Sequence, residues 1–217
     1  MYSKGEYRKD ILLKNAKELF YEKGYRNTTI REIAAKSGDP VSLVHYYFQK
    51  KDDILRTVYS DFCNNIDLFL YTKYADQGIE QDILLAHALN NRIYYDILLK
   101  DPCNSRVYGE ILESSTNARL IGRYVEYTSQ KYVDQYQISV SDEQLKACIA
   151  INFGGRREFY REYLSGRLPL DIQEGVSLIF SIFPRLIGID TREIDRALTQ
   201  SLEIFRQLPD TGIRFLA

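Results

Sequence analysis

The chain has 217 residues, of which 45% are hydrophobic and 27% are charged, so it can bury a large core and has the composition of a globular protein. Its apolar runs are too short for membrane spans, its N-terminal ten residues are charged, and its three cysteines are scattered. This composition excludes membrane-spanning and disulfide-stapled classes. We expect reduced thiols and a cytoplasmic protein.

The formal net charge of −1 conceals an asymmetry along the chain. Residues 1–60 hold 12 Lys and Arg against 8 Asp and Glu, a balance of +4, and the remaining residues have a balance of −5. A basic N-terminal quarter on an acidic body fits an anionic partner at one end only. Chance unevenness would give the same difference, so the charge alone decides nothing.

Helical periodicity runs through the whole chain. Leu12, Ala16 and Leu19 form one apolar stripe, and Gly24 follows as a helix stop. No segment shows the alternating pattern and hairpin turns of strands. We expect an all-α protein, with helices over residues 7–23, 29–36, 40–48, 51–74, 80–100, 103–114, 117–136, 142–165, 171–188 and 191–207.

The second and third expected helices carry clear end signals. Thr29 stands three residues before Glu32, which is the spacing of a capping box, and Gly38 ends that helix. Asp39 is expected to cap the third helix, with Pro40 at its first position. Two short helices joined by residues 37–39 have the dimensions of a helix-turn-helix, whose second helix lies in the DNA major groove.

The third helix is expected to have two faces. Val44, Tyr47 and Phe48 supply its inward face, so the remaining side chains point away from the core. Geometry alone leaves DNA binding and ordinary helical packing about equally plausible. The outward set is Val41, Ser42, His45, Tyr46 and Gln49, which contains hydrogen-bonding and aromatic groups and no acidic residue.

Residues 14–55, "KNAKELFYEKGYRNTTIREIAAKSGDPVSLVHYYFQKKDDIL", resemble the DNA-binding domain of the TetR family of transcriptional regulators. The resemblance implies a three-helix helix-turn-helix domain over residues 1–50 and a larger helical ligand-binding and dimerisation domain over residues 51–217. The residues that carry it are Ala16, Leu19, Phe20, Gly24, Tyr25, Thr28 to Ala34, Gly38, Tyr46 to Phe48, and Lys51 to Leu55. The chain departs from the family pattern at Asp39, Pro40, Ser42, Leu43, Val44, His45 and Tyr47, which leaves the operator sequence open.

The resemblance also implies which residues contact DNA. Thr28 or Thr29, Tyr46 and Lys51 are expected at the phosphates, where the free N–H groups of a helix N-terminus also favour an anion. Arg31 could equally be a solvated charge, and Lys51 could pair with a neighbouring aspartate. The base-reading candidates are Ser42, Leu43, His45 and Arg31.

A homodimer on a palindromic operator is the expected assembly, again from the resemblance. The segment 171–188 is apolar around most of its circumference, so it must be covered on several sides. Burial within its own subunit is the alternative. The candidate dimer residues are Ile179, Phe180, Phe183, Ile187, Leu198, Leu202 and Phe205.

Eighteen tyrosines and no tryptophan point to a cavity with apolar walls and hydroxyl groups, suited to an apolar or aromatic effector. Tyrosines at helical spacing also commonly sit at core edges, and Arg156 could form a salt bridge instead of holding a ligand. Gly154 and Gly155 in a helix interior suggest close helix approach or room for a ligand. The candidate ligand residues are Tyr94, Tyr95, Tyr108, Tyr124, Asn152 and Arg156.

The expected function is therefore a ligand-responsive transcriptional regulator, in the commoner case a repressor released by its effector. No catalytic residues, metal or cofactor are expected, since His45 and His87 lie outside metal-binding spacings and no phosphate-binding loop is present. The alternative is an all-α enzyme or a helical scaffold that binds another protein and never contacts DNA.

Overall fold

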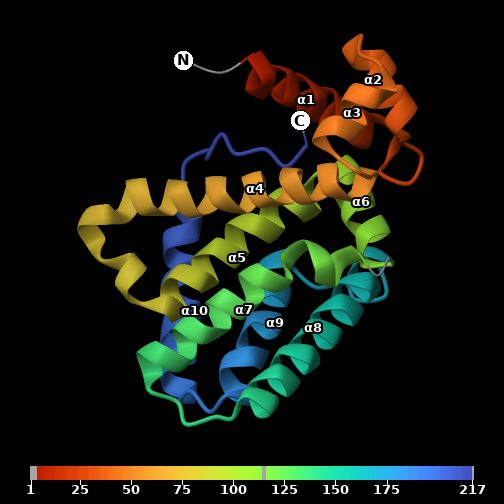
Figure 1. Ribbon diagram of the computed structural model, residues 1–217. Coiled ribbons are helices and arrows are strands. Elements are labelled where there is room, and N and C mark those ends of the chain that lie inside the picture. Colours follow the sequence, from red (N-terminus) through yellow and green to blue (C-terminus); the bar gives the residue numbers. More distant parts are fainter. Residues whose placement is uncertain (1–3, 114–115, 217) are drawn as a thin grey trace.

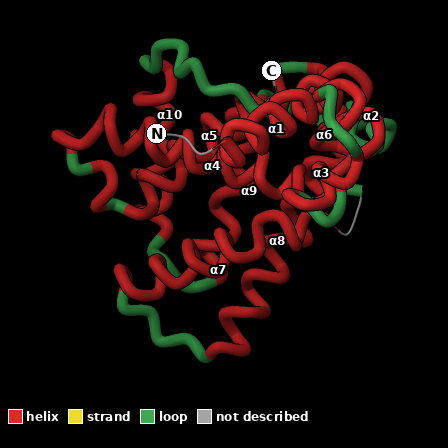
Figure 2. Tube along the Cα trace, turned by 45° about the horizontal axis from the view of Figure 1, so that its top comes forward, coloured by secondary structure: helices red, strands yellow, loops and turns green. Residues whose placement is uncertain are grey.

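The computed structural model describes residues 4–113 and 116–216, and their regular structure is helical throughout (Figures 1 and 2). The expected all-α class is confirmed, and each expected helix occurs with ends shifted by a few residues. None of the described helices is long and apolar enough to cross a bilayer. The helices are α1 (Lys4–Lys23), α2 (Ile30–Ser37), α3 (Val41–Tyr47), α4 (Lys51–Tyr74), α5 (Ile83–Lys100), α6 (Pro102–Leu112), α7 (Thr116–Tyr136), α8 (Asp142–Leu164), α9 (Ile172–Leu186) and α10 (Thr191–Arg206), with short 3-10 turns at Ala75–Gln77 and Ile79–Gln81.

The turn between α2 and α3 forms as its end signals predict. Thr29 Oγ1 accepts from the Glu32 backbone N–H while the Glu32 carboxylate accepts from Thr29 N, so the capping box closes in both directions. Gly38 takes φ 68°, a left-handed conformation that a side chain would strain, and ends α2.

The cap expected at Asp39 is wrong. Pro40 occupies the N-cap position of α3 and no side chain caps that helix. The Asp39 carboxylate is almost fully buried and instead accepts from Arg8 Nε at 2.9 Å, so a charge partner on α1 outcompetes the local backbone donors. This ion pair fixes the start of α3 against α1.

Helix α5 is the centre of the larger body (Figure 1). It packs against α4, α6, α7, α9 and α10, and its buried residues lie around its whole circumference. Helix α4 runs between this body and the α1–α3 unit, with buried residues from Ile54 to Tyr74. The helices around α5 therefore enclose space that its side chains share.

The segment after α10 returns to the N-terminal end of the molecule (Figure 1). Phe215 is buried there, with its ring centroid 4.8 Å from that of Tyr59 and 5.2 Å from that of Phe62 on α4. Buried residues form one cluster from α1 through α4 to Leu216. The expected domain boundary at residues 50 and 51 thus falls at the start of α4 without a break in the core, and it stays a prediction.

The expected dimer residues in α9 and directly after it face the chain's own core, which favours the alternative of burial within their own subunit. All four are at least 94% buried in the chain's own core, because α9 is covered by α5, α8 and α10. They are Ile179, Phe180, Phe183 and Ile187. The α10 candidates Leu198, Leu202 and Phe205 are partly buried in the same way.

A different apolar surface is exposed where α8 and α9 lie side by side. Ile151 and Leu178 each expose 57% of their surface, and Leu186 exposes 41%. A Cβ added at Gly154 would meet nothing within 4 Å, and one at Gly155 would touch Ile182 at 3.8 Å. Gly154 therefore leaves open space on the outer face of α8. We call Ile151, Gly154, Leu178 and Leu186 the α8–α9 face.

Candidate functional sites

Helix α3 presents a polar and aromatic surface at one end of the molecule. Tyr46 is 80% exposed, Ser42 and His45 are exposed, and Leu43 is half-buried. On the opposite side Val44 and Phe48 are buried against the rest of the unit. The helix thus has the two faces that its sequence indicates, with the outer one available to a partner.

The two neighbouring threonines before α2 lie in opposite environments. Thr29 is exposed as the N-cap, and Arg31 is exposed without a hydrogen bond or ion pair to the described residues. Thr28 is 1% exposed, and its hydroxyl donates to Gly24 O at 2.8 Å. The expected phosphate contact from the Thr28 side chain is therefore wrong, because a backbone carbonyl already occupies its donor.

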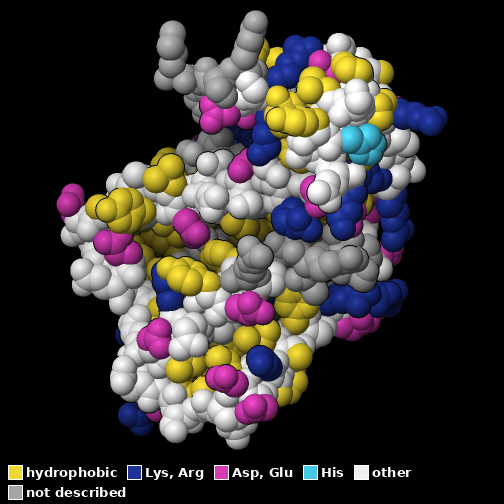
Figure 3. All heavy atoms as spheres, in the orientation of Figure 1, with side chains coloured by type: hydrophobic (Ala, Val, Ile, Leu, Met, Phe, Trp, Pro, Cys, Tyr) yellow, Lys and Arg dark blue, Asp and Glu magenta, His cyan; other side chains and the backbone are white. Residues whose placement is uncertain are grey.

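The Lys51 ammonium is held by the protein itself. It donates to the carbonyl oxygens of Tyr25 at 2.6 Å and Thr28 at 2.7 Å, and lies 4.3 Å from the Tyr25 ring centroid. Desolvation lowers its pKa. The adjacent Lys50 is exposed and its side chain makes no hydrogen bond to the described residues. Lys50 is thus freer than Lys51 to reach a phosphate, at an end of the molecule where Lys and Arg side chains gather (Figure 3).

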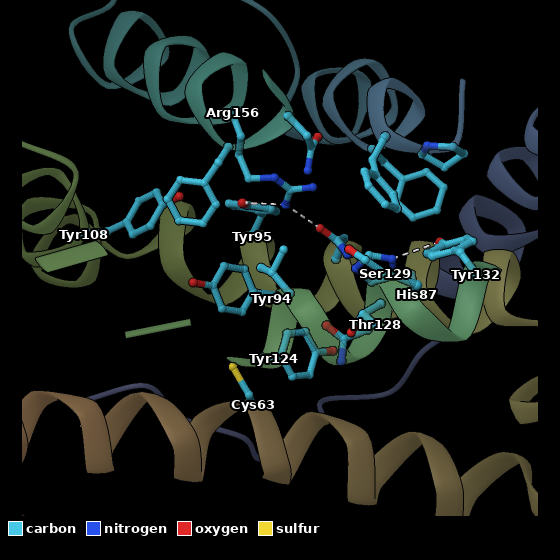
Figure 4. Close-up of a pocket in the computed structure, with 18 residues that line it drawn as sticks. Cys63, His87, Tyr94, Tyr95, Tyr108, Tyr124, Thr128, Ser129, Tyr132 and Arg156 are labelled. Atoms are coloured by element: carbon cyan, nitrogen blue, oxygen red, sulfur yellow. Dashed lines mark hydrogen bonds between the residues drawn. The ribbon is translucent and has the colours of Figure 1, made fainter. Parts of the chain in front are cut away.

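A cavity of about 80 Å³ lies inside the larger body, enclosed by α4 to α9 (Figure 4). The structure brings all six residues that the sequence singled out for a ligand to its wall: Tyr94, Tyr95, Tyr108, Tyr124, Asn152 and Arg156. The Tyr95 ring is stacked on Tyr160 with centroids 4.1 Å apart, which fixes that wall from behind.

The sequence reasoning missed several polar groups of the cavity. The run Asn90-Asn91-Arg92 inside an otherwise apolar helix is the signal that could have indicated them, since polar groups at buried positions require partners. Phe180 and Phe183, expected at a dimer interface, also line this cavity. The missed polar and thiol residues are Cys63, His87, Asn90, Asn91, Thr128 and Ser129.

Several titratable groups of the cavity wall are held neutral by burial. Burial and the nearby Arg156 charge lower the pKa of His87 to about 3, and the imidazole Nδ1 lies 2.9 Å from Tyr132 Oη. Burial raises the pKa of the Cys63 thiol to about 12 and raises the pKa of the Tyr94 and Tyr132 phenols. The wall therefore offers neutral hydrogen-bonding groups on aromatic surfaces.

Arg156 is the charged residue among the described residues that line the cavity. Its Nη1 donates to Asn91 Oδ1 at 2.8 Å and to Tyr95 Oη at 2.9 Å (Figure 4). The alternative weighed for it, a salt bridge to an acidic neighbour, does not form with any described residue. The guanidinium therefore lies in the wall with neutral partners only.

A groove adjoins the cavity between α4, α5 and α7. The two share four lining residues: His87, Asn90, Tyr124 and Thr128. The groove has a volume of about 390 Å³, and Tyr71 and Lys131 stand at its outer part. Apolar side chains gather in a hollow over this part of the surface in Figure 3. A small molecule could reach the cavity by this route.

Helix α6 connects the cavity to the α1–α3 unit. Tyr108 on one side of α6 lines the cavity, while Glu110 and Arg106 on the other sides reach the N-terminal unit. A Glu110 carboxylate oxygen accepts from Arg26 N at 2.8 Å, and Arg106 donates to Tyr21 O. A Cβ at Gly24, where φ is 91°, would meet that carboxylate, so glycine permits the close contact.

Comparison with protein families gives a match over residues 12–58 to the family described as "Bacterial regulatory proteins, tetR family". The matched segment spans the part of α1 from Leu12, then α2, α3 and the start of α4. A comparison with curated proteins gives no match.

Among the described residues, no group of three or more His, Cys, Asp or Glu could hold a metal ion.

Solved structures share the fold over nearly the whole chain. RolR in complex with the ligand resorcinol is 19% identical, with 96% of this chain and 98% of that chain covered and a TM-score of 0.62. A TetR transcriptional regulator from Rhodococcus sp. RHA1 is 17% identical over 86% and 98%, at 0.56. FadR from Bacillus subtilis with stearoyl-CoA is 18% identical over 83% and 98%, at 0.52. At these identities the likeness establishes the fold.

Proposed function

We propose that this chain, which carries the DNA-binding domain of the TetR family, is a ligand-responsive transcriptional regulator. In this proposal it is a repressor that binds a palindromic operator as a homodimer and is released when a small molecule occupies the cavity. DNA as its partner places the protein in the cytoplasm. The observation that carries the proposal is the connection, through α6, between a helix-turn-helix unit and an enclosed aromatic cavity.

DNA contact is assigned to the outer side of α3 and the residues beside it. Ser42 and His45 are exposed hydrogen-bonding groups for base edges, Leu43 can touch a thymine methyl, and Arg31 can reach a guanine. Tyr46 and Thr29 are positioned for phosphates, together with Lys50 in place of the engaged Lys51. In a homodimer the two α3 helices would enter successive major grooves about 34–36 Å apart.

The dimer contact is assigned to the α8–α9 face. A contiguous exposed apolar surface on a monomer commonly marks an interface, and here it includes Leu178 and Ile151 at 57% exposure each. Gly154 lets a second helix backbone approach closely because it offers no Cβ. A second copy of the chain is the occupant that the symmetric operator requires.

Effector binding would act through α6 and α4. A ligand among Tyr108 of α6 and Cys63 of α4 changes the packing of two helices that also contact the N-terminal unit. It can shift the protein between DNA-binding and released forms only by its difference in affinity for them, about 10⁴-fold for a swing from 1:99 to 99:1. The bonds of Glu110 and Arg106 to the N-terminal unit would carry the movement.

The test begins with selection of a preferred site from a pool of random DNA duplexes by the full-length protein. We expect affinity for that site to fall steeply with salt, and Tyr46→Ala to weaken binding to all sequences. His45→Ala should relax the preference among sites. Lys50→Ala should make the salt slope shallower by about one unit, whereas Lys146→Ala on the exposed surface of α8 serves as the unchanged control.

The outcomes separate the proposal from its rivals. Absence of any salt-dependent DNA binding would leave the scaffold or enzyme reading in place. DNA binding unaffected by Tyr46→Ala and Lys50→Ala together would refute the assigned surface. Lys51→Ala differs from these because it removes two bonds to carbonyl oxygens, so we expect it to lower the midpoint of thermal unfolding as well as DNA affinity.

A further inference from the structure

Two arginines are held within the larger body, and their donors are used very differently. Every nitrogen of the Arg92 guanidinium donates to an acceptor on α9 or α10, at distances from 2.9 to 3.3 Å. Arg156 uses Nη1 only, and its Nε and Nη2 donate to no acceptor among the described residues. The hydrogen-bond donors of Arg92 are therefore all used within the protein, whereas the Nε and Nη2 edge of the Arg156 guanidinium is free among the described residues.

The free edge of Arg156 has no carboxylate to meet. The described lining of the cavity contains no Asp or Glu, and the sequence of residues 114–123 contains none either. Asp67 lies in the adjoining groove, where it accepts from Asn90 Nδ2 at 2.7 Å, and burial raises its pKa. Because Arg stays protonated in proteins, an uncompensated positive charge faces the cavity.

Asn152 supplies a second unsatisfied group one helical turn before Arg156 on α8. It is 8% exposed, it lines the cavity, and its Oδ1 has no hydrogen-bond partner among the described residues. A buried acceptor without a partner costs free energy. An ionised carboxylate has no donor for Oδ1, so the part of Asn152 that can bind an anion is its amide N–H₂. Residues four apart share a helix face, so both unsatisfied groups are presented to the same part of the cavity.

The size and walls of the cavity limit what can lie there. Its volume of about 80 Å³ is roughly half the 150 Å³ of an engineered apolar cavity that accepts benzene. Tyr94, Tyr124 and Phe153 give it aromatic walls. A ligand with a single ring is the largest that modest side-chain adjustment would admit. The one positive charge of Arg156 matches a ligand with one negative charge.

We infer that the effector is a small aromatic monocarboxylate of the benzoate class, with its carboxylate on the Nε and Nη2 edge of Arg156. The regulatory role of this ligand rests on the proposed function, whereas its binding to the cavity does not depend on DNA. The carboxylate accepts two parallel charge-assisted hydrogen bonds from the planar fork. Asn152 can meet the carboxylate only through its amide N–H₂, since its Oδ1 accepts and the carboxylate has no donor, and the ring lies among the tyrosines and Phe153.

Calorimetric titration of the full-length protein tests the inference with four probes: benzoate, its neutral isostere benzamide, the phenol resorcinol, and acetate, which lacks a ring. We expect benzoate to bind at least tenfold more tightly than each of the other three. Arg156→Gln should weaken benzoate by about tenfold to one-hundredfold and leave benzamide nearly unchanged. Arg161→Gln, an exposed arginine on the same helix paired with Glu158, is the matched control.

Equal or tighter binding of benzamide or resorcinol by the wild type would overturn the inference, as would unchanged benzoate affinity in Arg156→Gln. Thermal unfolding checks that each variant folds. Should Arg156→Gln not fold, Arg156→Lys keeps the charge but loses the fork, and an unchanged benzoate affinity there would also overturn the two-bond geometry. Operator binding is measured separately, so a protein that binds DNA and is released by resorcinol fails this inference alone. One that binds benzoate and no DNA fails only the proposed function.

Discussion

His87 is a neutral imidazole in the cavity wall, and this gives the fold a predictable dependence on pH. Its pKa is lowered to about 3 by burial and by Arg156, against about 6.5 in an unfolded chain. Between these two pKa values, His87 is therefore protonated in the unfolded chain and neutral in the folded chain. The contribution of this group to stability is complete above pH 6.5 and is lost as the pH falls from there toward 3.

We expect the free energy of unfolding to drop by about 1–2 kcal/mol between pH 6.5 and 5 on account of His87. Denaturant unfolding at several pH values measures this. His87→Gln, which can still hydrogen-bond to Tyr132, should flatten the profile in that window, and His45→Gln on the exposed face of α3 should keep the wild-type profile. A profile as steep in His87→Gln as in the wild type would contradict the assignment.

Residue types and spacings predicted which side chains gather around the cavity better than which side chains of the N-terminal unit are exposed. All six ligand candidates line one cavity, where tyrosines on different helices bury their rings around a common centre. The spacing of Thr29 from Glu32 predicted its cap on α2, but no local pattern reveals that the neighbouring Thr28 hydroxyl is buried against Gly24 O. That burial depends on how the loop before α2 packs on the end of α1, where the hydroxyl also approaches Leu19 O.

Helix α6 touches both the cavity and the N-terminal unit, as α4 does, and its bonds to that unit are made by side chains. Its Glu110 carboxylate accepts from Arg26 N beside Gly24, and Arg26 pairs with Glu113 at 2.8 Å. Removing the Glu110 carboxylate should loosen this connection while leaving the cavity wall intact. We therefore expect Glu110→Ala to separate effector binding from its consequence for DNA.

The measurement compares operator affinity with and without whichever of benzoate or resorcinol releases the wild type. Glu110→Ala should reduce that ratio about fivefold or more, with ligand affinity nearly unchanged and a stability loss of about 0.5–1.5 kcal/mol. Glu158→Ala is the control, since that glutamate is exposed and pairs with Arg161 on its own helix. An undiminished ratio in Glu110→Ala would show that the coupling runs elsewhere, through α4.

At the level of helices, the sequence predicted well which helices exist and where they end, because local signals determine both. The capping box at Thr29 and the stop at Gly38 depend on neighbours in the chain. The faces of α9 could not be predicted in the same way. That helix is apolar on most sides, so only the placement of α5, α8 and α10 decides that Phe183 lies inside and Leu178 outside.

On the scale of the whole molecule, the core of one chain leaves the α8–α9 face uncovered, and this is where we expect the second copy. Gly154→Glu is the most informative variant. A Cβ there would meet nothing within 4 Å among the described residues, and replacing a helical glycine should stabilise the monomer by up to about 1 kcal/mol. In a dimer the same change places a charge between closely packed helices.

We therefore expect the wild type to have twice the 25.4 kDa chain mass in light scattering at micromolar concentration, and Gly154→Glu and Leu178→Glu to have the single-chain mass. Leu68→Glu is the matched control, because Leu68 is 59% exposed on α4 and Leu178 57% exposed on α9. The monomeric variants should also bind the selected operator far more weakly, since each would engage one half-site at a time. A wild type of single-chain mass, or a Leu178→Glu variant that stays dimeric while Leu68→Glu dissociates, would move the interface away from the α8–α9 face.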